Sequence, residues 1–151
     1  MGFNFKGIKD RKATQYIIVH CSATTEKQNI GAADIDRWHR LKGWMGIGYH
    51  YVIKRDGTIE EGRPRTSIGA HCEGFNSISL GICLVGGVNA DDLDEAKNNF
   101  TPAQFDALSK LLKELGKVYP TAAIRGHRDM PNVHKACPSF DVREWLKSSL
   151  R

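Results

Sequence analysis

The chain has 151 residues, with 22 lysines and arginines against 17 aspartates and glutamates, and a net charge of +5. This length is typical of one domain that buries its own core. The longest apolar runs, such as residues 16–19 and 81–85, are too short to cross a bilayer, so we expect no membrane segment. The basic charge favours an acidic partner, but without any zinc-finger spacing or RNA-binding aromatic motif a nucleic-acid-binding domain is only a minor alternative.

The first fourteen residues are a basic arm that contains Lys6, Lys9, Arg11 and Lys12. The arm has too little apolar periodicity to predict a buried element, so we expect a mobile tail or a docking arm for an unidentified protein partner. The remaining residues, 15–151, are expected to form the functional domain. The N-terminus has no apolar segment of a secretory signal, which predicts a cytoplasmic protein whose four cysteines stay reduced.

Residues 15–20 form a β-branched run typical of a central strand, with His20 at its carboxyl end. Residues 32–42 have the spacing of an amphipathic helix that Gly43 ends. The next segment, residues 48–60, carries Asp-Gly between two alternating stretches and predicts a hairpin. Residues 79–85 again indicate a buried strand.

Residues 88–100 are polar and acidic, which predicts a solvated surface loop. Residues 101–104 read Thr-Pro-Ala-Gln, a capping box with proline at the first helical position, so a long helix should begin there. A short strand at residues 122–124 and a last helix from Asp141 complete the pattern. Strands alternating with helices, together with a hairpin, predict one α/β domain: a mixed, central β-sheet flanked by about three helices.

Three residues of types that bind metal ions lie at or near predicted strand ends. His20 ends the first strand, His127 follows the strand near residue 124, and Cys137 lies in the loop after it. Two imidazoles and a thiolate, with a fourth position left for water, are a donor set for catalytic zinc, and Lys135 adds a positive charge nearby. Taken singly, each residue has an ordinary alternative as a packed or loop side chain, and spacing alone leaves both readings open.

Several motifs occur in order between about residues 15 and 147 and resemble the zinc-dependent N-acetylmuramoyl-L-alanine amidases related to peptidoglycan recognition proteins, most of all the phage lysozymes (endolysins) of the T-seven type. The arm and residues 88–99 fall outside this resemblance. The motifs are His20–Thr24, Trp38–His39, Gly43–Trp44, Gly48–Gly57, Gly69–His71, Gly81–Gly87, Phe100–Gln104 and Lys135–Asp141.

The resemblance implies that His20, His127 and Cys137 bind one zinc ion per chain and that Tyr49 and Lys135 are catalytic. It also implies a peptidoglycan recognition protein-like fold and a monomeric hydrolase. Such an enzyme cuts the amide bond between N-acetylmuramic acid and L-alanine of peptidoglycan, acting on the cell wall after release from the host cytoplasm. The presence of Cys137 favours an enzyme over the alternative, a muropeptide-binding module of the same fold that does not cut.

The remaining histidines are assigned from their positions in the predicted elements. His71, with Asn76, is expected to line the substrate cleft. His50 should face away from Tyr49 and pack in the interior, because neighbouring strand residues point to opposite faces. His39 is expected on the solvated side of its helix, and His134 at the rim of the site. No glutamate can be assigned as the general base.

Overall fold

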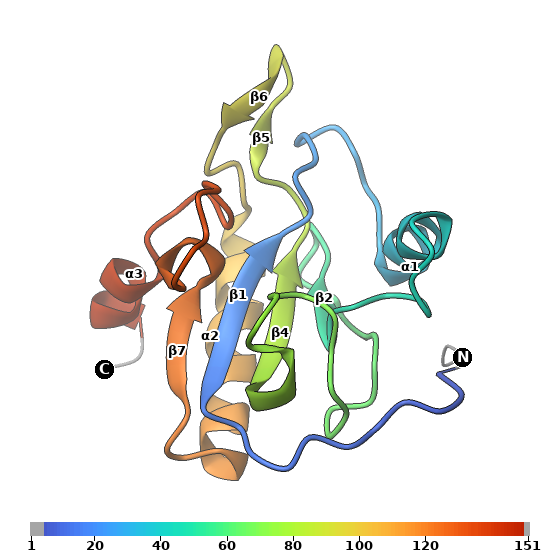
Figure 1. The fold of residues 1–151 in the computed structure, drawn as a ribbon. Helices are drawn as coiled ribbons and strands as arrows, with labels where there is room; N and C mark the ends of the chain where they lie inside the picture. The colour runs from blue at the N-terminus through green and yellow to red at the C-terminus, as the bar shows by residue number, and fades with distance from the viewer. Residues whose placement is uncertain (1–4, 150–151) are drawn as a thin grey trace.

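The computed structural model describes residues 5–149 and contains a five-stranded sheet in the order β3-β2-β4-β1-β7. Strand β1 pairs in parallel with β4 and with β7, and β2 pairs in parallel with β4. At the edge, β3 runs antiparallel to β2 (Figure 1). The strands of this sheet are β1 (Tyr16–Cys21), β2 (Tyr51–Ile53), β3 (Ile59–Glu61), β4 (Ser79–Leu84) and β7 (Ala123–Gly126).

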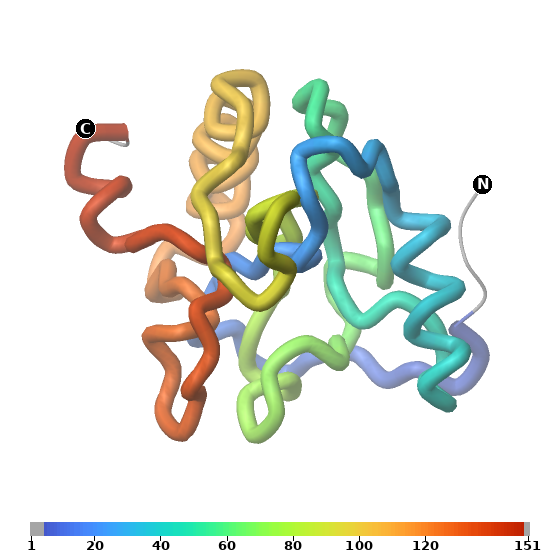
Figure 2. Tube along the Cα trace, turned by 90° about the horizontal axis from the view of Figure 1, so that it is seen from above, coloured from blue at the N-terminus to red at the C-terminus, as the bar shows by residue number. Residues whose placement is uncertain are grey.

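Within residues 5–149, three α-helices surround the sheet. The long helix α2 lies on one face, while residues 68–78 and 127–138 lie on the other (Figure 2). None of these helices has the length and hydropathy that a bilayer crossing requires. The strand order and the three helices confirm the prediction of a mixed, central β-sheet flanked by about three helices. The helices are α1 (Ala32–Leu41), α2 (Pro102–Val118) and α3 (Val142–Ser149), with short 3-10 turns η1 (Asn76–Ile78) and η2 (His127–Asp129).

Side chains of β1 point alternately to the two faces of the sheet, and each face packs against a different cluster of buried residues. Ile17 and Val19 are buried in the core cluster that includes the leucines of α2, whereas Ile18 belongs to a separate cluster with Cys72 and Met130. Successive strand residues point to opposite faces, so His20 shares the face of Ile18. The sheet therefore presents one mainly apolar face to α2 and one face that carries polar groups.

Helix α2 begins as its sequence predicts. The Thr101 hydroxyl accepts a hydrogen bond from the Gln104 main-chain N–H at 3.1 Å, and the Gln104 side chain accepts one from the Thr101 N–H at 3.0 Å. The buried Gln104 amide also donates to the main-chain oxygens of Ile53 and Val85, at 3.1 and 2.9 Å. The capping box thus fixes the helix start directly to β2 and to the end of β4.

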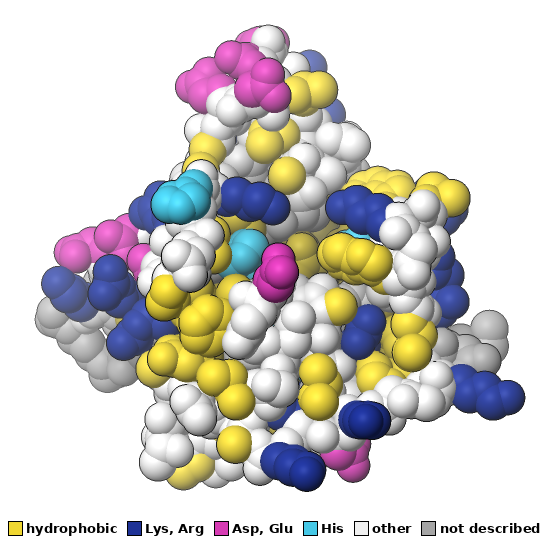
Figure 3. Space-filling model, in the orientation of Figure 1, with side chains coloured by type: hydrophobic (Ala, Val, Ile, Leu, Met, Phe, Trp, Pro, Cys, Tyr) yellow, Lys and Arg dark blue, Asp and Glu magenta, His cyan; other side chains and the backbone are white. Residues whose placement is uncertain are grey.

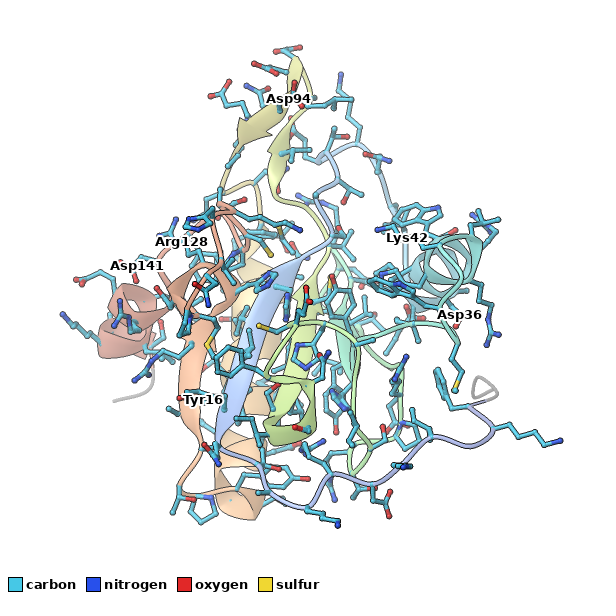
Figure 4. All side chains as sticks on the ribbon, viewed as in Figure 1. Tyr16, Asp36, Lys42, Asp94, Arg128 and Asp141 are labelled. Atoms are coloured by element: carbon cyan, nitrogen blue, oxygen red, sulfur yellow. The ribbon has the colours of Figure 1, made fainter. Side chains whose placement is uncertain are left out.

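Residues 88–100, predicted to be a loop, contain a small projecting hairpin. It consists of β5 (Val88–Asn89) and β6 (Asp92–Ala96), and Asp94 lies on β6 (Figure 4). All five residues of β6 are exposed. A strand with two solvated faces shows no hydrophobic alternation, which is why the sequence pattern did not reveal it.

The basic arm packs against the domain, although its sequence has too little apolar periodicity to predict a buried element; its expected role as a mobile tail or docking arm stays a prediction. Phe5 is buried together with residues of α1 and β2. The Arg11 main chain donates to the Thr66 carbonyl at 2.7 Å, and the guanidinium of Arg11 donates to the carbonyl oxygens of Arg65 and Ser67 at 2.9 and 2.7 Å. These bonds are made by main-chain groups and one arginine, so apolar periodicity could not predict them. The division of the chain after residue 14 remains a prediction.

Two buried histidines serve as acceptors for main-chain N–H groups. His50 packs in the interior, as predicted: its Nδ1 accepts from Gly81 at 3.0 Å and its Nε2 lies 2.8 Å from the Ser67 carbonyl. The prediction of a solvated His39 is wrong, because this side chain is buried and its Nδ1 accepts from Gly48 at 2.9 Å. Burial lowers the pKa of both imidazoles to about 4, so both are neutral at pH 7.

Replacing Arg11 with alanine tests how firmly the arm is held. Loss of its hydrogen bonds to two carbonyl oxygens, that of Ser67 partly buried, should lower the free energy of unfolding by about 2 kcal/mol. The exposed neighbour Lys12 provides the control, and Lys12→Ala should change it by less than about 0.5 kcal/mol. Urea denaturation measures both. Equal free energies of unfolding for the two variants would show that the arm is only loosely attached to the domain.

The buried histidines also predict a loss of stability in weak acid. The folded pKa of His50 lies below the unfolded value of about 6.5, so the unfolded chain binds more protons and stability falls as the pH drops from about 6.5 toward 4. For His50 alone the loss between pH 7 and pH 5 is about 2 kcal/mol. Urea denaturation in chelator at both pH values, with NMR titration of His50, checks this; titration of His50 near pH 6.5 would contradict it.

Candidate metal centre and its cleft

His20, His127 and Cys137 are brought together at the carboxyl edge of the sheet. One ligand atom from each residue can be chosen so that all three atoms lie within 4.8 Å of one another. The pairing of β1 with β7 explains this convergence, because Val19 lies opposite Gly126 and a histidine directly follows each of these two residues. Cys137 follows in the loop that returns over this edge.

His20 is the most enclosed member of the cluster. Its side chain is 1% exposed, and its ring centroid lies 4.4 Å from that of His127 and 5.1 Å from that of Tyr49. Burial, followed by the charges of neighbouring groups, holds the pKa of His20 well below its ordinary value. The pKa of His127 is lowered for the same first reason and by the charge of Lys135. Both imidazoles are therefore neutral and keep a lone pair for a cation.

Main-chain groups hold the Cys137 sulfur in place. The N–H of Cys21 donates to Cys137 Sγ at 3.1 Å, and the Cys137 carbonyl accepts from the N–H of Arg128 at 2.8 Å. A hydrogen bond with the Cys21 side chain, followed by burial, raises the pKa of the Cys137 thiol well above its ordinary value. A divalent cation coordinated by this sulfur would favour the thiolate instead.

The donor chemistry of this cluster fits zinc. Two neutral imidazoles and one sulfur are ligands that zinc accepts, and catalytic zinc sites use three protein ligands so that a fourth position remains open. The described cluster offers three such ligands without a carboxylate, whereas magnesium and calcium prefer oxygen ligands.

Tyr49 presents its ring to the same cluster. It precedes β2 and stacks at a tilt on His20 and on His39, with ring centroids 5.1 and 5.6 Å apart. Burial and the nearby cysteine side chains raise the pKa of Tyr49 well above its ordinary value. The phenol therefore keeps its proton, which makes it a hydrogen-bond donor.

A cleft of about 970 Å³ opens over the polar face of the sheet. His127 and Lys135 line it, so the cleft reaches the cluster of candidate metal ligands. The cleft also contains both residues predicted to line it, His71 and Asn76. In Figure 3 a hollow in the centre of the molecule shows a histidine bordered by hydrophobic side chains and by lysine or arginine. The lining residues are Trp44, Ala70, His71, Cys72, Glu73, Gly74, Phe75, Asn76, His127, Pro131, Asn132, Val133, His134 and Lys135.

The structure refines three of the predicted positions. His134 is exposed at the cleft rim, as expected. Asn76 directs its carboxamide oxygen at its own loop, where it accepts from the N–H groups of His71 and Cys72 at 2.8 and 2.9 Å. His71 Nδ1 lies 2.8 Å from His20 Nε2, a contact that the sequence analysis missed. No sequence spacing signals this contact, because it joins His20 on β1 to His71 in a loop 51 residues later in the sequence.

Known proteins resemble this chain in both sequence and fold. The family model of N-acetylmuramoyl-L-alanine amidases matches residues 10–140. The endolysin of Escherichia phage T7 is 47% identical over 141 residues, which are 93% of this chain and 91% of that protein.

Two solved structures share the fold. The endolysin amidase LysCS from Clostridium intestinale superposes with a TM-score of 0.82 at 28% identity, over 99% of this chain and 93% of that one. A Drosophila PGRP-LB mutant, solved in complex with tracheal cytotoxin, gives 0.77 at 25% identity, over 97% and 88%. With the family model, the phage relative and the fold in agreement, the chain belongs to the N-acetylmuramoyl-L-alanine amidase family and is a peptidoglycan hydrolase.

Proposed function

We propose that this amidase depends on one zinc ion per chain, bound by His20, His127 and Cys137, and that Tyr49 and Lys135 are its catalytic residues. The observation that carries the proposal is the convergence of the three ligand atoms within 4.8 Å beside a cleft that His127 and Lys135 line. A bound zinc ion would supply a Lewis acid that polarises the scissile carbonyl and lowers the pKa of a water molecule.

The side chains around the cluster have complementary tasks. Lys135 stands on the exposed loop two residues before Cys137, so its ammonium can stabilise negative charge that develops on the carbonyl oxygen of the substrate. Tyr49, held protonated by its raised pKa, can donate a hydrogen bond to the same oxygen or orient the attacking water. The group that accepts the proton of the water is not assigned.

The substrate is the amide that joins N-acetylmuramic acid to L-alanine, and the cleft of about 970 Å³ is where we expect it to bind. The solved PGRP-LB complex with tracheal cytotoxin supports muropeptide binding by this fold. We further propose that the protein works as a monomer, made in the host cytoplasm and acting on the cell wall after release. A role of the basic arm in docking a protein partner also remains a proposal.

Digestion of purified sacculi separates cutting from binding. An amidase releases new alanine amino groups without new reducing ends, while a muropeptide-binding module of the same fold or a nucleic-acid-binding domain releases nothing. Release of reducing ends would instead indicate cleavage of the glycan. The presence of Cys137 beside both histidines supports the amidase outcome.

Zinc content distinguishes ligands from neighbouring histidines. His127→Ala should abolish zinc binding and lysis, because two ligands cannot retain the ion at this site, while the fold persists on its own core. His134→Ala is the matched control on the same cleft wall and should keep one zinc per chain. Elemental analysis and circular dichroism measure both variants. A His127→Ala protein that retains stoichiometric zinc would remove His127 from the ligand set.

Lys135→Ala should keep zinc but lower kcat by about a hundredfold, because it removes charge stabilisation and leaves every ligand in place. Tyr49→Phe should keep zinc and lower kcat by at least about tenfold through loss of one donor. The exposed Lys110 on α2 provides a charge-matched control, and Lys110→Ala should retain the wild-type rate. Turnover on soluble muropeptides gives the readout; an unchanged kcat in either test variant would return that residue to a structural role.

A further inference from the structure

A chain of side-chain hydrogen bonds extends behind the metal cluster. His20 Nε2 lies 2.8 Å from His71 Nδ1, and His71 Nε2 lies 3.2 Å from Ser79 Oγ. The Ser79 hydroxyl in turn donates to the main-chain oxygen of Phe75 at 2.7 Å. The chain therefore runs from His20 to a carbonyl group in the loop that precedes η1.

The Phe75 carbonyl group fixes which atom donates in each of these three hydrogen bonds. The oxygen of Phe75 can only accept, so the single hydroxyl proton of Ser79 points at it. Ser79 Oγ must then accept from His71 Nε2–H, which leaves His71 Nδ1 with a lone pair. His71 Nδ1 accepts from His20 Nε2–H, so the free lone pair of His20 is on Nδ1.

This argument requires that each ring carries a single proton, and the surroundings provide that condition. His20 and His71 are 1% and 9% exposed, and no carboxylate side chain is hydrogen-bonded to either ring in the described structure. Burial away from water and from acidic partners favours the neutral ring, which carries one proton.

The ring of His71 fits a slot made by two glycines. A Cβ on Gly81 would lie 2.6 Å from His71 Cγ, and a Cβ on Gly69 would lie 2.7 Å from His71 Cδ2. The His71 main-chain N–H is bonded to Asn76 Oδ1 at 2.8 Å. Both ring nitrogens of His71 are thus engaged within the protein, so this residue forms the cleft wall without offering a ring nitrogen to substrate.

We propose that His71, oriented by Ser79, is a positioning residue that sets the tautomer of His20 and makes Nδ1 its metal-binding atom. The inference rests on the proposed zinc site and assigns to His71 a role other than substrate binding. Partners that orient a metal-ligating histidine typically change metal affinity by about 10- to 100-fold when they are removed.

Three variants test the chain of bonds. His71→Leu removes the acceptor for His20 Nε2–H and should weaken zinc binding by about 10- to 100-fold. His71→Asn places a carboxamide oxygen near the position of Nδ1 and should restore most of that affinity. Ser79→Ala leaves the His71 ring in place but frees its tautomer, so metal-free His20 should show both tautomers. Ile18→Val, on the same face of β1, is the control for packing loss and should leave zinc affinity unchanged.

The measurements are zinc affinity by competition with a chelator and the ¹⁵N chemical shifts of the His20 ring. Metal-free wild-type protein should show His20 protonated on Nε2, and zinc should shift Nδ1. Protonation on Nδ1, a zinc-induced shift on Nε2, or wild-type affinity in His71→Leu would each overturn the inference. A wild-type protein that takes up no zinc would overturn the proposed function instead, while the tautomer of the metal-free protein would still test the role of His71.

Discussion

The parallel register of β1 against β7, in which Val19 lies opposite Gly126, places His20 and His127 at the same edge of the sheet. Parallel strands direct their carboxyl ends to one side, and ligand sites in α/β proteins occur at that side. The same register sets the main-chain N–H of Cys21 against the sulfur of Cys137. One strand therefore supplies a ring to the cluster and, one residue later, anchors the third candidate ligand.

The polar face of the sheet tolerates its histidines because each has a defined partner. Among the described residues, no buried side-chain nitrogen or oxygen lacks a hydrogen-bond partner. His39 and His50 accept main-chain N–H groups, and His71 links His20 to Ser79. Glycines at 69 and 81 provide the space that the His71 ring occupies. Neutral imidazoles with hydrogen-bond partners avoid the cost of burying charge next to the candidate metal ligands.

Sequence reasoning located the elements that have a strong periodic or capping signal. The strand expected at residues 79–85 is observed at Ser79–Leu84, and the capping box at Thr101 starts α2 as predicted. The sequence predicted that His20, His127 and Cys137 lie at or near strand ends, and the pairing of β1 with β7 brings their ligand atoms within 4.8 Å of one another. The burial of His39 depends on a hydrogen bond with the main chain of Gly48, and the arm is held by Phe5 and by bonds of Arg11 to main-chain groups. No local periodic pattern contains that information.

The acidic β5–β6 hairpin gives the molecule an uneven distribution of charge. Asp91, Asp92, Asp94 and Glu95 are exposed at its end, while the chain as a whole carries a net charge of +5 (Figure 3). Near an anionic polymer network the hairpin is repelled and the basic body is attracted, so the electrostatic torque favours approach with the hairpin pointing outward. At physiological salt this torque acts only within a Debye length of about 8 Å, so it orients the protein at contact and not at a distance.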